Sequence, residues 1–264
     1  MIDVQDLRIT FGKGTPMETA ALRGVSLTIP EGQFVTVIGS NGAGKSTFLN
    51  ALSGEAIPDS GKIAIDDTDV SKWPTYKRCG LVARVFQDPM AGSCANLTIA
   101  ENMGLAAARG RRRGLSASVT KDLREKVRER LARLGLGLED RLDDPMELLS
   151  GGQRQAVSLL MATFNPMKIL LLDEHTAALD PKIAAFVVDL TRQIVEEQKL
   201  TTLMVTHSMR QALDVGERTV MLHEGRVVLD VAGDERKGLT VEDLLHMFEK
   251  VRGEELDDDR LLLG

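Results

Sequence analysis

Cysteine and aromatic residues are scarce in this chain, and this scarcity excludes several classes of protein. Only Cys79 and Cys94 occur in 264 residues, and they do not have the spacing of a metal site. A secreted domain held by disulfides needs more cysteines, so a reducing cytoplasm fits better. Aromatic residues make up 3%, which disfavours a surface that stacks the bases of single-stranded nucleic acid.

Long apolar runs and an excess of positive charge are also missing. The most apolar stretch, residues 157–172, is interrupted by Asn165, Pro166 and Lys168, so it does not span a membrane. The first residues lack the basic and apolar segments of a signal peptide. The net charge of −6 argues against a general nucleic-acid binder. Any contact with a membrane would therefore go through a partner.

The remaining sequence has the pattern of an α/β protein with a helical insertion. A compact, β-branched run at 34–38 predicts a strand, and the runs at 169–172 and 202–206 do not alternate with polar residues, which is typical of parallel strands buried on both faces. A helix expected over 181–198 lies between the last two runs and completes a β-α-β unit. Apolar residues at helical spacing predict a mostly helical segment from about 88 to 165.

The C-terminal part is expected to contain a hairpin and one more helix. Residues 220–222 and 227–231 flank Glu224 and Gly225 and indicate two antiparallel strands. Thr240 and Asp243 have capping-box spacing at the start of an apolar helical pattern. The acidic tail at 254–259 is expected to be solvated.

The strongest local motif is a phosphate loop, in which a glycine-rich turn leads from a strand into a helix. Its glycines let backbone N–H groups surround phosphates, and the helix N-terminus favours anions. Lys45 can reach the β- and γ-phosphates, and the Ser46 hydroxyl can ligate Mg²⁺. The motif consists of Gly39, Ser40, Asn41, Gly42, Ala43, Gly44, Lys45, Ser46 and Thr47. It predicts a nucleoside-triphosphate site.

Two acidic residues end the apolar strand at 169–172. An acid pair after a strand is common by itself, but beside a phosphate loop it predicts two roles. Asp173 would hold Mg²⁺ or its water, and Glu174 would orient or deprotonate the attacking water.

A second glycine-rich segment, Leu149–Gln153, precedes another helix. By itself it indicates a serine cap with flexible glycines. It is also a second anion-binding helix N-terminus, which one nucleotide hardly needs within one subunit. The sequence Leu-Ser-Gly-Gly-Gln, between a phosphate loop and an acidic strand end, resembles the ATP-binding-cassette (ABC) ATPases. Gln87 resembles the glutamine of that family's Q-loop, Ala178–Asp180 its D-loop, and His207 its switch histidine.

The resemblance covers about residues 3–250 and implies a fold. That fold is a phosphate-loop NTPase (RecA-like) α/β core with an N-terminal antiparallel β subdomain and an inserted α-helical subdomain. The expected boundaries give a single ABC ATPase domain over 1–250. Within it, 1–87 and 166–239 form the core and 88–165 the helical subdomain, with a C-terminal helix and tail at 240–264.

The resemblance also implies a mechanism in which ATP joins two copies of the chain head to tail. Ser150, Gly151, Gly152 and Gln153 of one copy would bind the γ-phosphate held by the other, with Asp180 nearby. Glu174 would be the catalytic carboxylate and His207 the γ-phosphate sensor. Gln87 would join Ser46 and Asp173 at Mg²⁺. Phe11 stands near where the family stacks an aromatic ring on adenine, although it could equally be a core strand residue.

Several residues lie outside the motifs that carry the resemblance. Many relatives have proline after the catalytic glutamate, where this chain has His175, which we expect to be a partly exposed loop residue. His223 and His246 are expected to be structural or on the surface. The basic run Arg109–Arg113 indicates a solvated loop, with contact to anionic lipid or a membrane partner as the alternative and nucleic acid third.

The resemblance predicts an ATP-hydrolysing transporter subunit at the inner face of the cell membrane, with permease subunits on separate chains. This layout is most common in bacterial importers, which adds a solute-binding protein as a partner. Residues 34–41 and 173–180 are similar to a subgroup linked to amino-acid-type uptake. The alternative is a membrane-associated ABC ATPase that signals through its partner without transport. The chain lacks the coiled coils, zinc cysteines and second cassette of non-transport ABC ATPases, and a phosphate-loop kinase would have no use for Leu149–Gln153.

Overall fold

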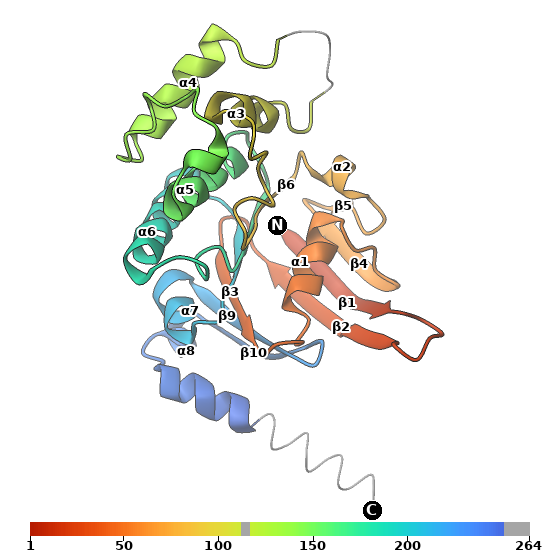
Figure 1. The fold of residues 1–264 in the computed structure, drawn as a ribbon. Coiled ribbons are helices and arrows are strands. Elements are labelled where there is room, and N and C mark those ends of the chain that lie inside the picture. The colour runs from red at the N-terminus through yellow and green to blue at the C-terminus, as the bar shows by residue number, and fades with distance from the viewer. Residues whose placement is uncertain (112–116, 251–264) are drawn as a thin grey trace, which may run out of the picture.

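The computed structural model describes residues 1–111 and 117–250, which form two β-sheets with helices around them (Figure 1). The larger sheet contains β3 (Phe34–Gly39), β6 (Val82–Val85), β7 (Ile169–Asp173), β8 (Thr202–Val205), β9 (Arg218–His223) and β10 (Arg226–Ala232). Its order is β10-β9-β3-β8-β7-β6, with β10 antiparallel to β9 and the other neighbours parallel. The smaller, antiparallel sheet contains β1 (Ile2–Phe11), β2 (Thr19–Ile29), β4 (Ser60–Ile65) and β5 (Thr68–Asp69).

The central strands are apolar throughout because both faces of the larger sheet are covered. In β7, Ile169 and Leu171 pack toward the smaller sheet, whereas Leu170 and Leu172 pack toward the helical side. Helix α1 (Lys45–Ser53) lies between the two sheets, and its Phe48 is buried in the same cluster as Ile169 (Figure 1). Because successive side chains of a strand point to opposite faces, the apolar residues of β7 contribute alternately to two hydrophobic cores.

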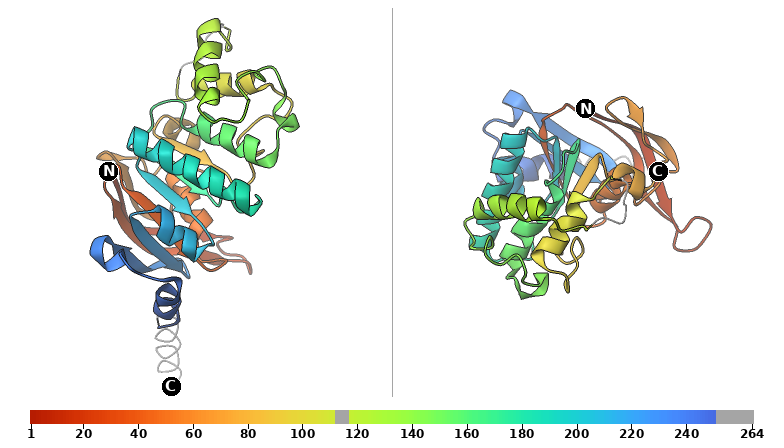
Figure 2. Two further views of the ribbon diagram at one scale, coloured as in Figure 1. Left: turned by 90° about the vertical axis from the view of Figure 1, so that its left-hand side faces the viewer. Right: turned by 90° about the horizontal axis from the view of Figure 1, so that it is seen from above.

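The remaining elements are α2 (Thr75–Arg78), α3 (Ile99–Ala107), α4 (Lys121–Ala132), η1 (Met146–Leu148), α5 (Gly151–Ala162), α6 (Pro181–Gln198), α7 (Met209–Val215) and α8 (Gly233–Arg236). Helices α3, α4 and α5 follow β6 and precede β7, and they stand together at one end of the molecule in both side views (Figures 1 and 2). A last described helix occupies 241–250, and Thr240, just before it, exchanges reciprocal hydrogen bonds with Asp243 in its first turn.

The expected fold class is confirmed, with local differences in where elements begin. Helix α6 has the expected bounds, whereas α5 begins at Gly151, inside the glycine-rich segment that was expected to precede it, because Ser150 caps it. The domain boundaries stay a prediction, and the acidic tail at 254–259 lies outside the described residues. Among the residues described, no helix combines the length and hydrophobicity needed to cross a membrane.

The basic run at 109–113 is described only in part, since Arg112 and Arg113 lie outside the described residues. A solvated loop was the expectation for the whole run, and for Arg109 it is wrong. Its guanidinium donates a hydrogen bond of 2.8 Å to the carbonyl oxygen of Ala162, and burial lowers its pKa. Arg111 is exposed.

Candidate functional site

The phosphate loop (Gly39–Thr47) connects β3 to α1 at the carboxyl edge of the larger sheet. Gly39 and Gly44 have positive φ angles of 151° and 97°. A Cβ atom at Gly39 would lie 2.2 Å from the carbonyl oxygen of Leu222, and one at Gly44 would lie 2.6 Å from that of Ala21. Both positions therefore need glycine, for its conformational freedom and for space.

The start of α1 is arranged to receive an anion. No side chain caps this helix, so the amide groups of its first turn are not engaged by a capping residue. The Nζ atom of Lys45 donates hydrogen bonds of 2.9 and 3.0 Å to the carbonyl oxygens of Gly39 and Ser40. Burial lowers the pKa of Lys45, and the charges of Glu174 and Asp173 oppose that shift. Amides and a cation thus converge at one helix end.

The two acids after β7 have different partners. Asp173 accepts a hydrogen bond of 2.5 Å from Arg84, whereas Oε1 of Glu174 lies 2.6 Å from Nε2 of His207. Glu174 has a φ of 46°, a left-handed conformation that is uncommon outside glycine. Since His207 follows β8, the neighbour of β7, both side chains lie at the same edge of the sheet. The bent backbone gives two adjacent carboxylates separate environments.

A glutamine joins the segments that carry Glu174 and His207. Thr206 donates a hydrogen bond of 2.5 Å to Oε1 of Gln211, and Nε2 of Gln211 lies 3.2 Å from the hydroxyl of Thr176. This bridge connects the chain after β7 to the chain after β8. It restricts the relative movement of the Glu174–His207 pair.

A pocket of about 580 Å³ brings several predicted residues together. Phe11, Ser40–Thr47, Glu174 and His207 line it. Phe11 is 49% exposed, so it is not the core strand residue that the sequence left open. Gln87, Asp180 and the signature loop (Leu149–Gln153) do not line this pocket.

The signature loop forms the start of α5. The Ser150 hydroxyl accepts from the Gln153 backbone N–H at 3.3 Å, and the Gln153 side chain accepts from the Ser150 N–H at 3.1 Å. A Cβ atom on Gly152 would lie 2.2 Å from a methyl carbon of Ile183, so contact with α6 requires glycine there. Asp180 caps α6 through a 3.1 Å bond from the Ile183 N–H. Helix capping thus accounts for Ser150 and Gln153 of the signature loop, and close packing accounts for Gly152.

This chain is similar to known proteins in sequence and in fold. A family model described as ABC transporter matches residues 22–177. The chain is 44% identical over 252 residues to the "Tyrosine transport ATP-binding protein" of Clostridioides difficile (strain R20291), which covers 94% of this chain and 99% of the relative. This chain belongs to the ABC transporter family.

Further matches extend the comparison. The thiamine import ATP-binding protein ThiQ of Escherichia coli (strain UTI89 / UPEC) is 35% identical over 210 residues, covering 80% of this chain and 85% of the relative. A solved dimeric ATP-binding cassette, in a post-hydrolysis state bound to ADP and Pi, is 30% identical with a TM-score of 0.76. It covers 88% of this chain and 98% of that chain. The chain is therefore an ATP-binding and ATP-hydrolysing subunit of an ABC transporter.

One expectation for this ABC subunit is wrong. His175 was expected to be partly exposed, but it is 2% exposed and its Nε2 lies 3.1 Å from the hydroxyl of Thr191 on α6. Burial lowers the pKa of His175 to about 4, so the ring is neutral at pH 7. The side chain that follows Glu174 is thus buried against α6, with the Thr191 hydroxyl as a polar partner.

The sequence analysis assigned no role at this site to three residues that lie around it in the structure. His223 and Glu224 line the pocket from the turn between β9 and β10, and His223 also contacts Phe248 of the last helix. Arg84 contacts Asp173 from β6. The signal for Arg84 was a single arginine among the apolar residues of 82–85, because a charged residue is unusual in a buried strand unless it has a charged partner.

Proposed function

We propose that this ABC subunit binds Mg-ATP in the pocket at the phosphate loop and hydrolyses it to drive uptake of an amino-acid-type substrate. The observation that carries the proposal is the convergence of the uncapped start of α1, Lys45 and the Glu174–His207 pair on one pocket. The triphosphate would lie over the first turn of α1, with Lys45 at the β- and γ-phosphates. Phe11, half-exposed at the pocket, would stack on adenine.

The residues that the sequence predicts at the metal offer donors that fit Mg²⁺. Ser46 supplies a hydroxyl from the first turn of α1, Asp173 a carboxylate and Gln87 an exposed amide, all oxygen donors. Within the described ranges, no group of three or more His, Cys, Asp or Glu could hold a metal by itself. This agrees with an ion held largely by nucleotide phosphates. When bound, Mg²⁺ would neutralise developing negative charge on those phosphates.

Glu174 is proposed as the general base for hydrolysis. Its carboxylate accepts a proton from water as the water oxygen bonds to the γ-phosphorus and the bond to the β–γ bridging oxygen breaks, giving ADP and phosphate. Glu174 is only 11% exposed in its side chain, and His207 fixes its orientation at 2.6 Å. His207 would also contact the γ-phosphate.

The signature loop is proposed to complete the site of a second copy of the chain. Ser150 is exposed although it begins a buried helix, and the neighbouring Leu148 is also exposed. The solved relative with ADP and Pi is dimeric. Ser150, Gly151, Gly152 and Gln153 would face the γ-phosphate held by the partner copy, with Asp180 nearby.

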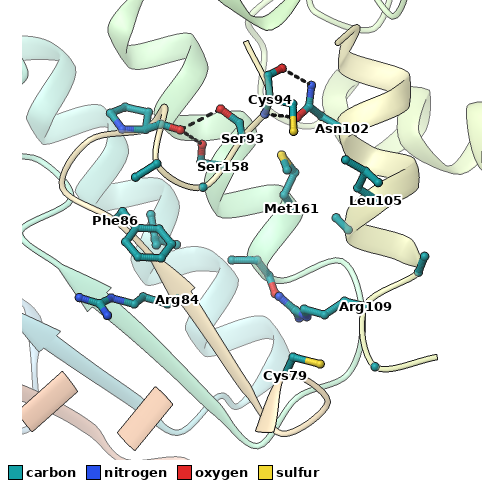
Figure 3. Close-up of a pocket in the computed structure, with 18 of the residues that line it drawn as sticks. Cys79, Arg84, Phe86, Ser93, Cys94, Asn102, Leu105, Arg109, Ser158 and Met161 are labelled. Carbon is teal, nitrogen blue, oxygen red and sulfur yellow. Dashed lines mark hydrogen bonds between the residues drawn. The ribbon is translucent and has the colours of Figure 1, made fainter. Parts of the chain in front are cut away.

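A groove of about 740 Å³ lies between β6, α3 and α5, and we propose it as the docking site for a permease subunit (Figure 3). Leu105 and Tyr76 are exposed apolar side chains on its wall, while Met161 and Phe86 line its interior. Arg111 adds a positive charge. A short amphipathic segment from the cytoplasmic side of a permease would match this lining. The subunit would then lie peripherally on the inner face of the membrane.

The proposal of an amino-acid-type substrate rests on the relative named for tyrosine transport, whose similarity spans nearly the full length of both chains. Substrate choice would lie in the permease, with a solute-binding protein as a further partner. We expect no nucleic-acid partner, since the chain has a net charge of −6.

The decisive experiment is affinity purification of the tagged chain from gently solubilised membranes, with mass spectrometry of the co-eluting proteins. We expect a polytopic permease with the wild type and its loss with Leu105→Glu. Leu245→Glu is the matched control, because Leu245 is 42% exposed on the last helix and Leu105 is 37% exposed. A membrane protein that transports nothing would favour signalling. Ribosomal or DNA-repair proteins, without a permease, would overturn the proposal.

A further inference from the structure

Arg84 lies beside the aspartate that the proposed function assigns to Mg²⁺. Its side chain is only 10% exposed, although it comes from a strand that is otherwise apolar. The guanidinium lies 2.5 Å from Asp173, 2.9 Å from Glu55 and 2.7 Å from Oδ1 of Asn50. It also stacks over the ring of Phe86 at 4.8 Å (Figure 3 labels both side chains).

These contacts connect Arg84 to both elements of the proposed metal site. Asn50 lies one helical turn after Ser46 on α1, and Asp173 ends β7. The guanidinium therefore spans from the helix that carries the hydroxyl ligand to the strand that carries the carboxylate ligand. Two carboxylates offset the cost of holding this cation in a nearly closed space.

We propose that Arg84 is an internal cation that competes with Mg²⁺ for Asp173, so that the site accepts a divalent ion only together with nucleotide phosphates. This inference rests on the proposed Mg-ATP site. Arg84 is a positioning residue here, since it acts through Asp173 and does not line the pocket at the phosphate loop.

Positive charge near Asp173 is the physical reason why Arg84 would compete with a divalent cation. Lys45 and Arg84 both lie near Asp173, so a bare divalent cation entering the site would meet two positive side chains. Mg-ATP instead carries net negative charge and adds oxygen ligands to those of the protein. Electrostatic interactions over a few ångströms in a half-closed site are strong enough to change an affinity by about tenfold or more.

The test measures metal binding without turnover. Mn²⁺, in place of Mg²⁺, is titrated onto the full chain with and without a non-hydrolysable ATP analogue, and free Mn²⁺ is followed by electron paramagnetic resonance. We expect wild type to bind Mn²⁺ tightly only with the analogue. Arg84→Gln should bind Mn²⁺ alone at least about tenfold more tightly than wild type. Adding Asp173→Asn to Arg84→Gln should abolish that gain.

Glu55→Gln should change the affinity for Mn²⁺ in the opposite direction, toward weaker binding. Glu55 is partly exposed, so its amide variant is expected to fold. Arg84 would then pair with Asp173 alone, and the concentration of Mn²⁺ needed for half-maximal analogue binding should rise several-fold. Arg218→Gln is the control, since this arginine also pairs with a carboxylate, Asp230, but away from the site. It should change neither titration.

The outcomes separate the inference from the proposed function. If wild type binds no analogue in the presence of Mn²⁺, the proposed function fails. If wild type binds it but Arg84→Gln binds Mn²⁺ alone equally or more weakly, Arg84 supports the ligand instead of competing with the metal, and the inference fails. A Glu55→Gln shift toward tighter metal binding would also overturn it, even if Arg84→Gln does not fold.

Discussion

Helices α1 and α5 both begin in glycine-rich loops, but they differ in whether side chains bond the backbone N–H groups of the first turn. The first turn of α1 has no side-chain cap and opens into a pocket with Lys45, Glu174 and His207. The first turn of α5 is closed by the reciprocal bonds of Ser150 and Gln153 and lies outside that pocket. We propose that the first is a binding site within one chain, whereas the second, which its own side chains cap, faces a second copy of the chain.

This difference fits the proposal that the two loops bind nucleotide in different ways. A loop that must capture phosphates benefits from unengaged amides and a nearby cation. A loop that meets its ligand only across an interface must stay folded while the interface is open, and a capping box provides this.

Lys45→Ala should have the largest effect, since it removes the cation from the pocket at α1. We expect ATP hydrolysis to fall by about a thousandfold or more, because phosphoryl transfer depends on stabilising charge. Phosphate release with saturating Mg-ATP is the measurement, and Lys62→Ala, at an exposed lysine on β4, is the control. Turnover at the wild-type rate in Lys45→Ala would refute the phosphate-loop assignment.

Glu174→Gln should separate binding from hydrolysis. An amide cannot accept the proton from water, so turnover should fall by about a hundredfold or more while ATP still binds. The ATP-bound dimer should then accumulate, and size-exclusion chromatography with light scattering at saturating Mg-ATP detects it. Glu31→Gln, at an exposed turn, should behave as wild type. A strictly monomeric Glu174→Gln variant would count against a site shared between two copies.

The sequence predicted the loop at α1 more completely than its surroundings. Gly39, Lys45 and Asp173 lie at strand ends and helix starts, and parallel topology alone brings such positions to one edge. Arg84 and His175 could not be assigned this way, because their roles depend on neighbours distant in sequence. Arg84 meets Glu55 and Asp173 across 29 and 89 positions. His175 meets Thr191 across 16 positions, directly after Glu174 with its left-handed backbone.

His175 should make stability depend on pH. Its pKa is about 4 in the folded chain, below the ordinary value of 6.5. The unfolded chain therefore binds more protons between these values, so stability is full above about pH 6.5 and falls as the pH drops toward 4. The loss should reach about 2 kcal/mol at pH 5.

Urea unfolding at pH 7.5 and pH 5 measures this loss. His175→Gln can still bond Thr191 but does not titrate, so its stability should depend less on pH than that of wild type. His246→Gln, at an exposed histidine on the last helix, is the control and should keep the wild-type dependence. An equal pH dependence in wild type and His175→Gln would show that burial of this ring does not govern acid stability.

Removing the cap of α5 should cause the smallest change in stability, and it tests directly whether Ser150 does more than cap a helix. Helix α3 has the same kind of cap and is the matched comparison. Thr98 caps α3 with Glu101 through the same reciprocal bonds that join Ser150 and Gln153. Ser150→Ala and Thr98→Ala should each lower the free energy of unfolding by about 1 kcal/mol. Only Ser150→Ala should also weaken the ATP-dependent dimer, measured in the Glu174→Gln background. If both variants weaken the dimer equally, capping alone explains Ser150, and the signature loop does not face a partner's nucleotide.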